Sequence, residues 1–348
     1  MMINKGKSIQ DLRISIFEAN LFYLFVGLLL LIVGSYVQKK EIFLGLIITE
    51  YLIILVPCIF FLKIKGLPFR RTLKLNPINI KQVLLIIGIT IFTYPLAVLA
   101  QGIFVMFLND IKEVTPTALP LPRDGFQFII GFLILALSPG ICEEVMFRGL
   151  LLSSYEKIGP RKSIIIIALL FGIFHFTILN FIGPTILGII FGIMVHKTNS
   201  LYSSILGHTV NNTIALAIGY YMNRYQQLLD KMMIDDIIYN PPASSEIRSL
   251  VIAVLFFICC IYFVSKMLNE LEMEGDGVIE EGDYREGFNE EFPFEYYNLD
   301  YDSLEASFEN YPIHENPSPN SVLDKLKYIP VLAIVIIFIM INWFNFFL

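Results

Sequence analysis

Residues 126–152 read FQFIIGFLILALSPGICEEVMFRGLLL, an apolar run that holds two adjacent glutamates and an arginine. A helix crosses the hydrocarbon core of a bilayer with about 20 predominantly apolar residues, so this run is long enough to cross a membrane. A charged residue inside such a span costs at least about 2.5–3.5 kcal/mol. Because charges persist there when they have a partner or a function, the run predicts a membrane helix with a buried polar site.

The composition of the whole chain agrees with a membrane protein. Of its 348 residues, 56% are hydrophobic and 16% are charged, and the mean hydropathy is +0.68. A soluble domain carries about 25% charged residues, and the smaller share here is too low to cover a water-facing surface. No basic patch interleaves with aromatic residues, so a role in nucleic-acid binding has no support.

Apolar runs recur along the chain and are continuous rather than alternating, which favours helices over barrel strands. Eight of them form one block and a ninth stands near the C-terminus. The 184–196 run is short for a full crossing, so a partly re-entrant helix is an alternative interpretation of it. The predicted fold is an all-α polytopic membrane protein with an eight-helix core and a ninth, C-terminal transmembrane helix. The runs cover roughly 14–37, 42–62, 82–108, 126–152, 163–179, 184–196, 201–223, 249–268 and 329–348.

Lysine and arginine in the connecting loops predict the orientation, because cytoplasmic loops carry an excess of them. The basic 63–81 loop is therefore placed in the cytoplasm. Because successive spans cross in opposite directions, the N-terminus, the 153–162 loop and Lys197 then also lie on the cytoplasmic side. These regions hold 13 Lys and Arg residues, against seven in the outside loops. The N-terminus is therefore expected in the cytoplasm of a multi-pass cell-membrane protein, and the C-terminus is expected outside.

The chain divides into two N-terminal helices (1–79), a core (80–268), an acidic segment (269–328) and the last helix (329–348). The acidic segment holds 17 of the 31 acidic residues and only three basic ones, a net charge of −14. It is rich in Gly, Pro and Asn, which is typical of a solvated, disordered cytoplasmic linker. Its interleaved Phe and Tyr residues leave a second interpretation open, in which it docks a protein partner.

Ionisable residues inside the spans fall at helical spacing. Glu144 and Arg148 are four residues apart and can pair on one helix face, whereas Glu143 points about 100° away and can face a cavity. Two later spans each add a pair of residues that are four positions apart and share a helix face. The pairs are Phe171 with His175 and His208 with Asn212.

The depths of these residues agree with one another. At about 1.5 Å per residue, Glu143, His175 and His208 lie roughly 14, 18 and 11 Å from the cytoplasmic ends of their spans. Three helices thus deliver a carboxylate and two imidazoles to one layer. The alternative interpretation is a polar cluster that only joins helices.

The available chemistry is water activation. The sequence holds no G-x-S-x-G, P-loop or H-E-x-x-H motif. In one version Glu143 is the general base, and Asn212 with one histidine holds the oxyanion. In the other, His175, His208 and a glutamate carboxylate such as that of Glu143 bind Zn²⁺ and leave a position open for water. The residues alone do not separate these versions.

Together, Glu-Glu-x-x-x-Arg at 143–148, Phe-x-x-x-His at 171–175 and His-x-x-x-Asn at 208–212 resemble the CPBP family of type II CAAX prenyl endopeptidases and bacterial Abi proteins. The resemblance covers roughly residues 80–223 and leaves out the acidic segment and the ninth run. It implies an eight-helix intramembrane endopeptidase in which Glu143 activates water, His175, His208 and Asn212 surround it, and Glu144, Arg148 and Phe171 support the site. The family leaves open whether a metal takes part.

The expected function is hydrolysis of a peptide bond in a membrane-embedded or lipidated peptide. The Ile-, Lys- and Asn-rich composition is typical of a low-GC bacterium, which favours a membrane-embedded peptide over a prenylated CAAX tail. Two alternatives remain. The first is a non-enzymatic membrane scaffold that docks partners through 269–328, and the second is a transporter that uses the buried polar cluster as an ion site.

Overall fold

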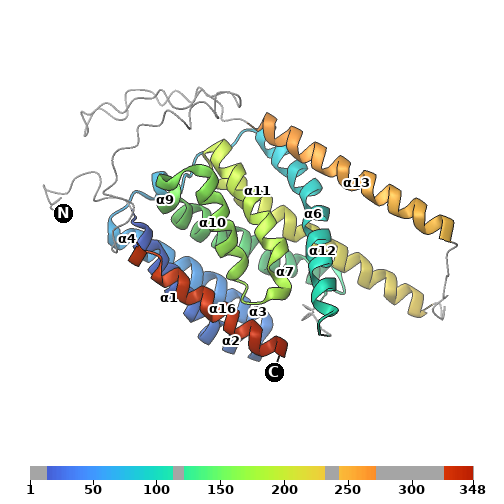
Figure 1. Cartoon of the computed structure of the whole chain (residues 1–348), viewed down its shortest axis with the longest axis horizontal. Helices are drawn as coiled ribbons and strands as arrows, with labels where there is room; N and C mark the ends of the chain where they lie inside the picture. Colours follow the sequence, from blue (N-terminus) through green and yellow to red (C-terminus); the bar gives the residue numbers. More distant parts are fainter. Residues whose placement is uncertain (1–13, 113–120, 232–242, 272–324, 348) are drawn as a thin grey trace, which may run out of the picture. The chain divides into compact units, whose positions relative to one another are not determined.

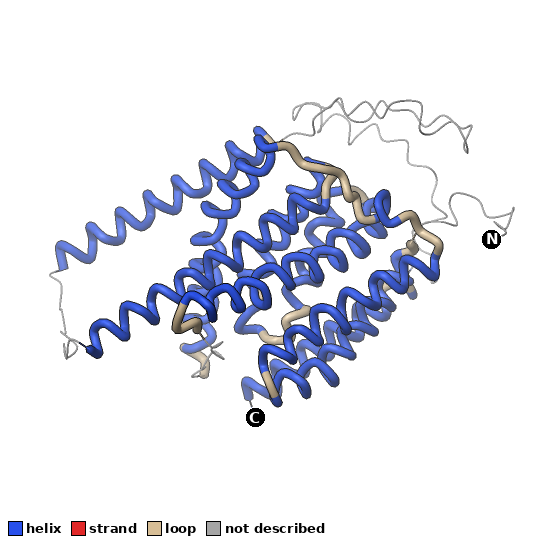
Figure 2. Tube along the Cα trace, turned by 180° about the vertical axis from the view of Figure 1, so that it is seen from behind, coloured by secondary structure: helices blue, strands red, loops and turns tan. Residues whose placement is uncertain are grey.

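A computed structural model of the chain describes residues 14–112, 121–231, 243–271 and 325–347 (Figure 1). Every regular element in these ranges is helical and none is a strand (Figure 2), which confirms the all-α prediction. The N-terminal basic residues, and the predictions of disorder or partner docking within 272–324, lie outside the described residues.

Long helices cover each predicted apolar run, some of them interrupted by π-helical turns. The first rod, Ile16–Lys40, contains α1 and α2, the second, Ile42–Lys65, contains α3 and α4, and the fourth, Gly125–Ile158, contains α7, α8 and α9. The bounds are α1 Ile16–Leu29, α2 Ser35–Lys40, α3 Ile42–Ile47, α4 Val56–Lys65, α6 Ile80–Asn109, α7 Gly125–Gly131, α8 Ser138–Glu144, α9 Leu152–Tyr155, α10 Pro160–Ile173, α11 Ile182–Thr198, α12 Leu201–Lys231, α13 Ala243–Glu270 and α16 Ile329–Phe347.

Six of the described helices are long and apolar enough to cross a membrane, so the chain is a multi-pass membrane protein. They are Ile16–Lys40, Ile42–Lys65, Ile80–Asn109, Gly125–Ile158, Ile178–Thr198 and Arg248–Glu270. The count of eight plus one is not confirmed. α10 has 14 residues, α12 is interrupted by polar residues, and α16 offers a shorter apolar stretch, Ile329–Asn345.

The prediction of a span over 163–179 is wrong at its C-terminal end. α10 stops at Ile173, and His175 lies in the following turn rather than inside a helix. The chain turns back at this point because Gly172 has no side chain. A Cβ at Gly172 would meet the Phe181 ring and carbonyl oxygen at 2.9 Å. α11, conversely, is longer than the predicted 184–196 run, and Asn199 ends it in the left-handed conformation.

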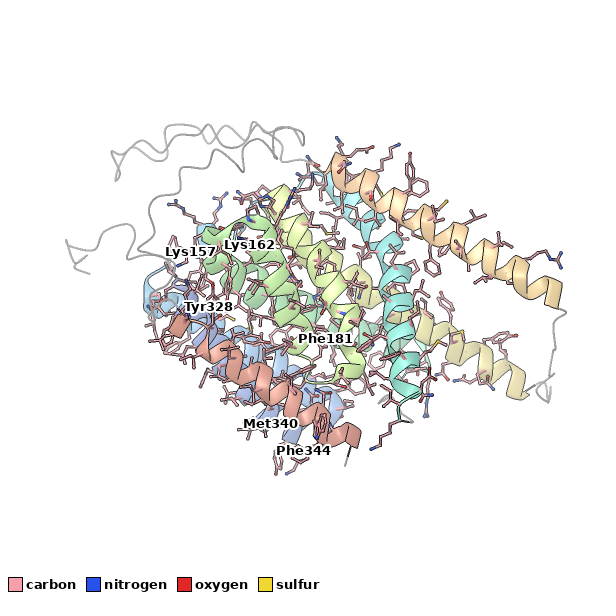
Figure 3. All side chains as sticks on the ribbon, in the orientation of Figure 1. Lys157, Lys162, Phe181, Tyr328, Met340 and Phe344 are labelled. Atoms are coloured by element: carbon pink, nitrogen blue, oxygen red, sulfur yellow. The ribbon has the colours of Figure 1, made fainter. Side chains whose placement is uncertain are left out.

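The loops that the charge bias places in the cytoplasm lie at one end of the helices. Ion pairs join Lys65 to Glu18 and Lys74 to Glu156. The backbone N–H of Leu201 donates to the carbonyl of Lys74 at 2.9 Å. Figure 3 shows Lys157 and Lys162 close together at this end, near the start of α16 at Tyr328. The basic loops therefore share one end of the bundle.

The core surrounds the rod Gly125–Ile158. The buried ring of Tyr23 on α1 packs against Phe147, and its hydroxyl donates to the carbonyl of Leu170 at 2.7 Å. The Tyr155 hydroxyl donates to Asn20 on α1 at 2.6 Å. α16 lies alongside α1 on the outer side of this core (Figure 1). These contacts hold the N-terminal and C-terminal helices on the part of the chain that carries the motifs.

α10 and α11 form a close antiparallel pair through the Gly-x-x-x-Gly of Gly188 and Gly192, a pattern that lets membrane helices approach. A Cβ at Gly188 would lie 3.0 Å from Cα and Cβ of Ala168, and one at Gly192 would lie 2.9 Å from Ile164. The Gly188 carbonyl also accepts a hydrogen bond from Arg148. The helix pair and the charged cluster therefore share this contact.

We expect Gly188→Val to lower the free energy of unfolding by about 1–3 kcal/mol, because the added methyls force the two helices apart. Thermal unfolding of the detergent-purified protein measures this. Gly102→Val is the matched control, since nothing lies within 4 Å of a Cβ at Gly102 on α6. Equal destabilisation by both substitutions would contradict the close packing of α10 and α11.

Candidate active site

The adjacent glutamates lie at the end of α8, in the middle of the long rod. π-helical stretches precede and follow α8, at Phe132–Leu137 and Val145–Leu151. Pro139 stands at the start of α8, in a first turn where a missing N–H is tolerated. Inserted π-helical turns are frequent at functional sites, and here they flank the segment that carries the predicted catalytic residues.

Gly140 allows α12 to approach this segment. A Cβ at Gly140 would contact the Thr209 side chain and would lie 3.2 Å from its backbone nitrogen and 3.3 Å from its Cα. Thr209 follows His208 in the chain. The absence of a side chain at Gly140 therefore brings the His208 imidazole within reach of both glutamates.

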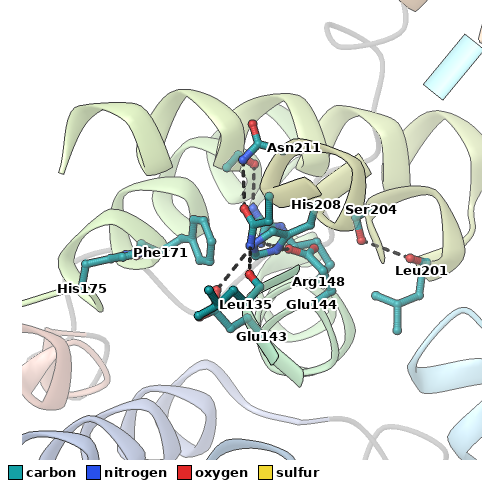
Figure 4. Close-up of polar contacts among 12 residues, drawn as sticks. Leu135, Glu143, Glu144, Arg148, Phe171, His175, Leu201, Ser204, His208 and Asn211 are labelled. Atoms are coloured by element: carbon teal, nitrogen blue, oxygen red, sulfur yellow. Dashed lines mark hydrogen bonds and ion pairs between the residues drawn. The ribbon is translucent and has the colours of Figure 1, made fainter. Parts of the chain in front are cut away.

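Glu144 and Arg148 form the buried ion pair that their spacing predicts (Figure 4). The Nη1 of Arg148 donates to Oε1 of Glu144 at 2.8 Å, and the two side chains are 1% and 0% exposed. The Nη2 of Arg148 donates to the Gly188 carbonyl at 3.1 Å. The guanidinium carbon also lies 4.6 Å from the centre of the Phe171 ring and 5.5 Å from that of Phe191, distances typical of cation–π contacts.

His208 connects this ion pair to Glu143. Its Nδ1 lies 2.9 Å from Oε1 of Glu144 and its Nε2 lies 4.0 Å from Oε2 of Glu143. Because a carboxylate paired to arginine can only accept, Nδ1 carries the hydrogen and donates it. In the neutral form of the ring, Nε2 then presents a lone pair toward Glu143. Stacking on Phe191, with ring centres 5.4 Å apart, fixes the plane of the ring.

The two neighbouring glutamates therefore differ in environment, as their 100° separation predicts. Glu144 is fully buried and bound to both Arg148 and His208. The Glu143 side chain is 13% exposed and is separated from His208 by 4.0 Å. Of the two, Glu143 is the more accessible carboxylate.

His175 lies on the other side of Phe171. Its Nδ1 is 3.0 Å from the Phe171 carbonyl oxygen, which can only accept, so Nε2 carries the free lone pair. The Phe171 ring meets His175 and His208 edge to face, with ring centres 5.4 and 5.8 Å apart. Phe171 thus contacts both imidazoles and the Arg148 guanidinium, while His175 makes no described hydrogen bond to Glu143.

Asn212 on α12 points toward the rod Gly125–Ile158. Its Nδ2 donates to the carbonyl of Leu135 at 3.1 Å, and its Oδ1 accepts from Nδ2 of Asn211 at 3.0 Å (Figure 4). These two bonds fix the amide, and the second N–H of Asn212 is left to donate elsewhere. An amide held in this way is chemically suited to bind an oxyanion.

The predicted metal ligands do not form one coordination group. Among the described residues, no three His, Cys, Asp or Glu side chains are arranged to hold an ion. Glu143 and His208 lie 4.0 Å apart, and His208 Nδ1 already binds Glu144. The phenyl ring of Phe171 stands beside both His208 and His175.

Sequence reasoning missed Glu50, in the second rod. Its side chain is 6% exposed, and its Oε2 has no hydrogen-bond partner among the described residues. It is close enough to Glu143 for the two carboxyl groups to interact electrostatically. The hydroxyl of its neighbour Tyr51 is 3.1 Å from that of Ser138 on α8. An acidic residue inside the apolar run 42–62 is energetically costly, and this signal could have identified Glu50 from the sequence.

Residues 125–214 match the family model described as Type II CAAX prenyl endopeptidase Rce1-like. All three motifs lie inside the matched residues, so the match confirms the resemblance on the segment that carries them. No curated protein and no solved structure matches the chain. The fold and site define a polytopic helical membrane protein with a buried acid–base cluster. Its residues 125–214 are similar to the type II CAAX prenyl endopeptidase family.

Removing Arg148 should destabilise the protein strongly. Arg148→Met leaves the buried Glu144 carboxylate without its cation, and we expect a loss of about 3–5 kcal/mol. Glu144→Gln combined with Arg148→Met should recover most of that loss, because both charges are gone. Thermal unfolding in detergent measures both variants, with Arg224→Met on exposed α12 surface as control. Wild-type stability of Arg148→Met alone would contradict the ion pair.

Glu50→Met should raise stability by about 1–3 kcal/mol, because it removes a buried carboxyl group whose Oε2 has no hydrogen-bond partner among the described residues. The same unfolding assay measures this, and Glu270→Met at an exposed position serves as control. A lower stability of Glu50→Met would show that the carboxyl has a partner, such as a bound water or ion.

Proposed function

We propose that the chain is an intramembrane endopeptidase that hydrolyses a peptide bond in a membrane-embedded or lipidated peptide. One observation carries the proposal, the 4.0 Å separation between Oε2 of Glu143 and Nε2 of His208. Two hydrogen bonds of about 2.8 Å that meet at one water span this separation when they form an angle of roughly 90°. The pair is therefore suited to hold a water molecule.

Both groups that face this water accept hydrogen bonds. Glu143 accepts in its ionised form, and His208 in its neutral form accepts at Nε2 because its Nδ1–H donates to Glu144. The water directs one hydrogen to each group, and its oxygen lone pairs then face an incoming carbonyl. As the oxygen attacks the carbonyl carbon, Glu143 takes the proton. The peptide C–N bond then breaks, and Glu143 returns the proton to the leaving amine nitrogen.

The negative charge on the carbonyl oxygen needs a donor during this step. Asn212 supplies it in our proposal, through the N–H that does not bind Leu135. Glu144 keeps His208 in one tautomer, as the carboxylate of a catalytic triad does, and Arg148 keeps Glu144 ionised. His175 is assigned to the site by its motif, next to Phe171.

The substrate class follows from the surroundings of the site. Helices with apolar outer faces surround Glu143, which supports a substrate that enters from within the bilayer. The family name adds prenylated CAAX peptides as candidates. The composition supports a bacterial cell membrane, for which an unprenylated membrane peptide is the better candidate. The Lys and Arg residues of the loops support an N-terminus in the cytoplasm.

Glu143→Gln keeps the shape of the side chain and removes the base, so we expect cleavage to fall by at least about 10²-fold with unchanged thermal stability. Purified protein in liposomes is assayed by mass spectrometry of the products, with a farnesylated CAAX peptide and an unlipidated transmembrane peptide as separate substrates. Glu270→Gln is the exposed control.

Two outcomes would contradict the proposal. Wild-type protein that cleaves neither peptide would favour the scaffold that docks partners through 269–328. Cleavage by Glu143→Gln at the wild-type rate would remove Glu143 from the mechanism.

The mechanism above uses no metal, and zinc bound by Glu143, His175 and His208 is the alternative prediction. Metal analysis of the detergent-purified protein separates them, with wild type and the double variant His175→Ala/His208→Ala measured in parallel. We expect no stoichiometric zinc in either sample. About one zinc per chain in wild type that disappears in the double variant would establish a metallopeptidase.

A further inference from the structure

The loop that carries His175 follows a helix that is too short to cross a bilayer. α10 has 14 residues and is therefore about 21 Å long, shorter than the roughly 30 Å hydrocarbon core. α10 by itself therefore does not cross the core, and the turn that follows it is buried at Phe174 and Phe176. Irregular backbone in this environment must have its N–H and C=O groups satisfied by the protein itself. Two side-chain amides, far away in the sequence, do this for the loop 174–183.

Asn342 on α16 is the first of these amides. Its Oδ1 accepts from the N–H of Ile178 at 2.7 Å, and its Nδ2 lies 3.3 Å from the carbonyl oxygen of Phe176 and donates to it. The same Nδ2 donates within α16 to Phe338 at 2.8 Å. The residue is 8% exposed. Asn342 thus bridges the two residues that flank Thr177, and the bridge begins one residue after His175.

Gln101 on α6 is the second amide. Its Nε2 donates to the carbonyl of Leu179 at 2.7 Å, and its Oε1 accepts from the N–H of Gly183 at 2.9 Å. The two amides hold successive parts of the same loop from two different helices. Each satisfies one N–H and one C=O, so the loop is fixed by four hydrogen bonds from these two side chains.

α16 is seated closely enough to keep Asn342 in place. A Cβ at Gly27 on α1 would lie 2.5 Å from Ile334 of α16 and 3.4 Å from the Phe176 ring. Ile334 is fully buried. The rings of Phe181 and Phe338 also meet, with centres 5.9 Å apart. α16, α1 and the loop therefore pack at one point.

The backbone next to His175 needs this support. Phe176 has a φ of +54°, a conformation that is unfavourable for a bulky residue and persists where neighbouring contacts impose it. Release of the Phe176 carbonyl would allow the peptide to relax. The His175 ring, which Nδ1 anchors to Phe171, would then turn with it.

We propose that α16 is a positioning element of the active site, and that Asn342, together with Gln101, fixes the loop that places His175 beside Phe171. The inference rests on the proposed endopeptidase function. It assigns a role to a helix that lies outside the residues of the family match. The competing explanation is that the amides only satisfy the loop backbone and the site does not depend on them.

Hydrogen exchange tests the contact without reference to activity. Asn342→Leu should increase amide exchange in peptides from 174–183 by about tenfold or more, while Asn345→Leu, at an exposed position of the same helix, should leave it unchanged. Gln101→Leu is the second variant and should loosen the same peptides. Unchanged exchange in both Asn342→Leu and Gln101→Leu would overturn the proposal.

Kinetic measurements on the full chain in liposomes test whether Asn342 on α16 positions His175 for cleavage. Below the unfolding temperature of each variant, Asn342→Leu should lower kcat by about tenfold or more with KM within about twofold of wild type, because His175 is misplaced while the binding surface remains. Asn345→Leu should match wild type. Faster loop exchange with unchanged kcat would overturn the proposal. Wild-type protein without cleavage would overturn the proposed function instead, and exchange would still report on the Asn342 contact.

Discussion

The buried ion pair of Glu144 and Arg148 is the interaction on which the rest of the site depends. A lone charge at this depth is expensive, and each partner removes that cost from the other. Arg148 also binds the Gly188 carbonyl on α11, and Glu144 binds His208 on α12. The pair thereby connects three helices at one level of the bundle. A polar network of this kind is stable only when its members are present together.

The commitment of Glu144 to this pair leaves Glu143 free for chemistry. Neighbouring residues on a helix point about 100° apart, so one carboxylate can be buried while the next faces an accessible space. His208 joins the two, because one ring nitrogen is held by Glu144 and the other faces Glu143. In the proposed mechanism, Glu144 therefore has the structural role and its neighbour Glu143 has the catalytic one.

Local patterns predicted the helices and the ion pair, because hydropathy and i, i+4 spacing act within one segment. They did not predict the end of α10, which depends on Phe181 packing on Gly172. Nor did they predict that Asn342 would hold the loop after His175, since that contact joins residues 164 positions apart. Glu50 carried the signal of a charge in an apolar run, but it belongs to no motif.

An experimental structure of Glu143→Gln with an uncleaved membrane peptide bound tests the central claim most directly. We expect the scissile carbonyl carbon to lie beside the residue-143 side chain and Nε2 of His208. Glu144 should still be paired with Arg148. A scissile carbonyl held against Glu144, or a metal ion ligated by Nε2 of His208, would contradict it.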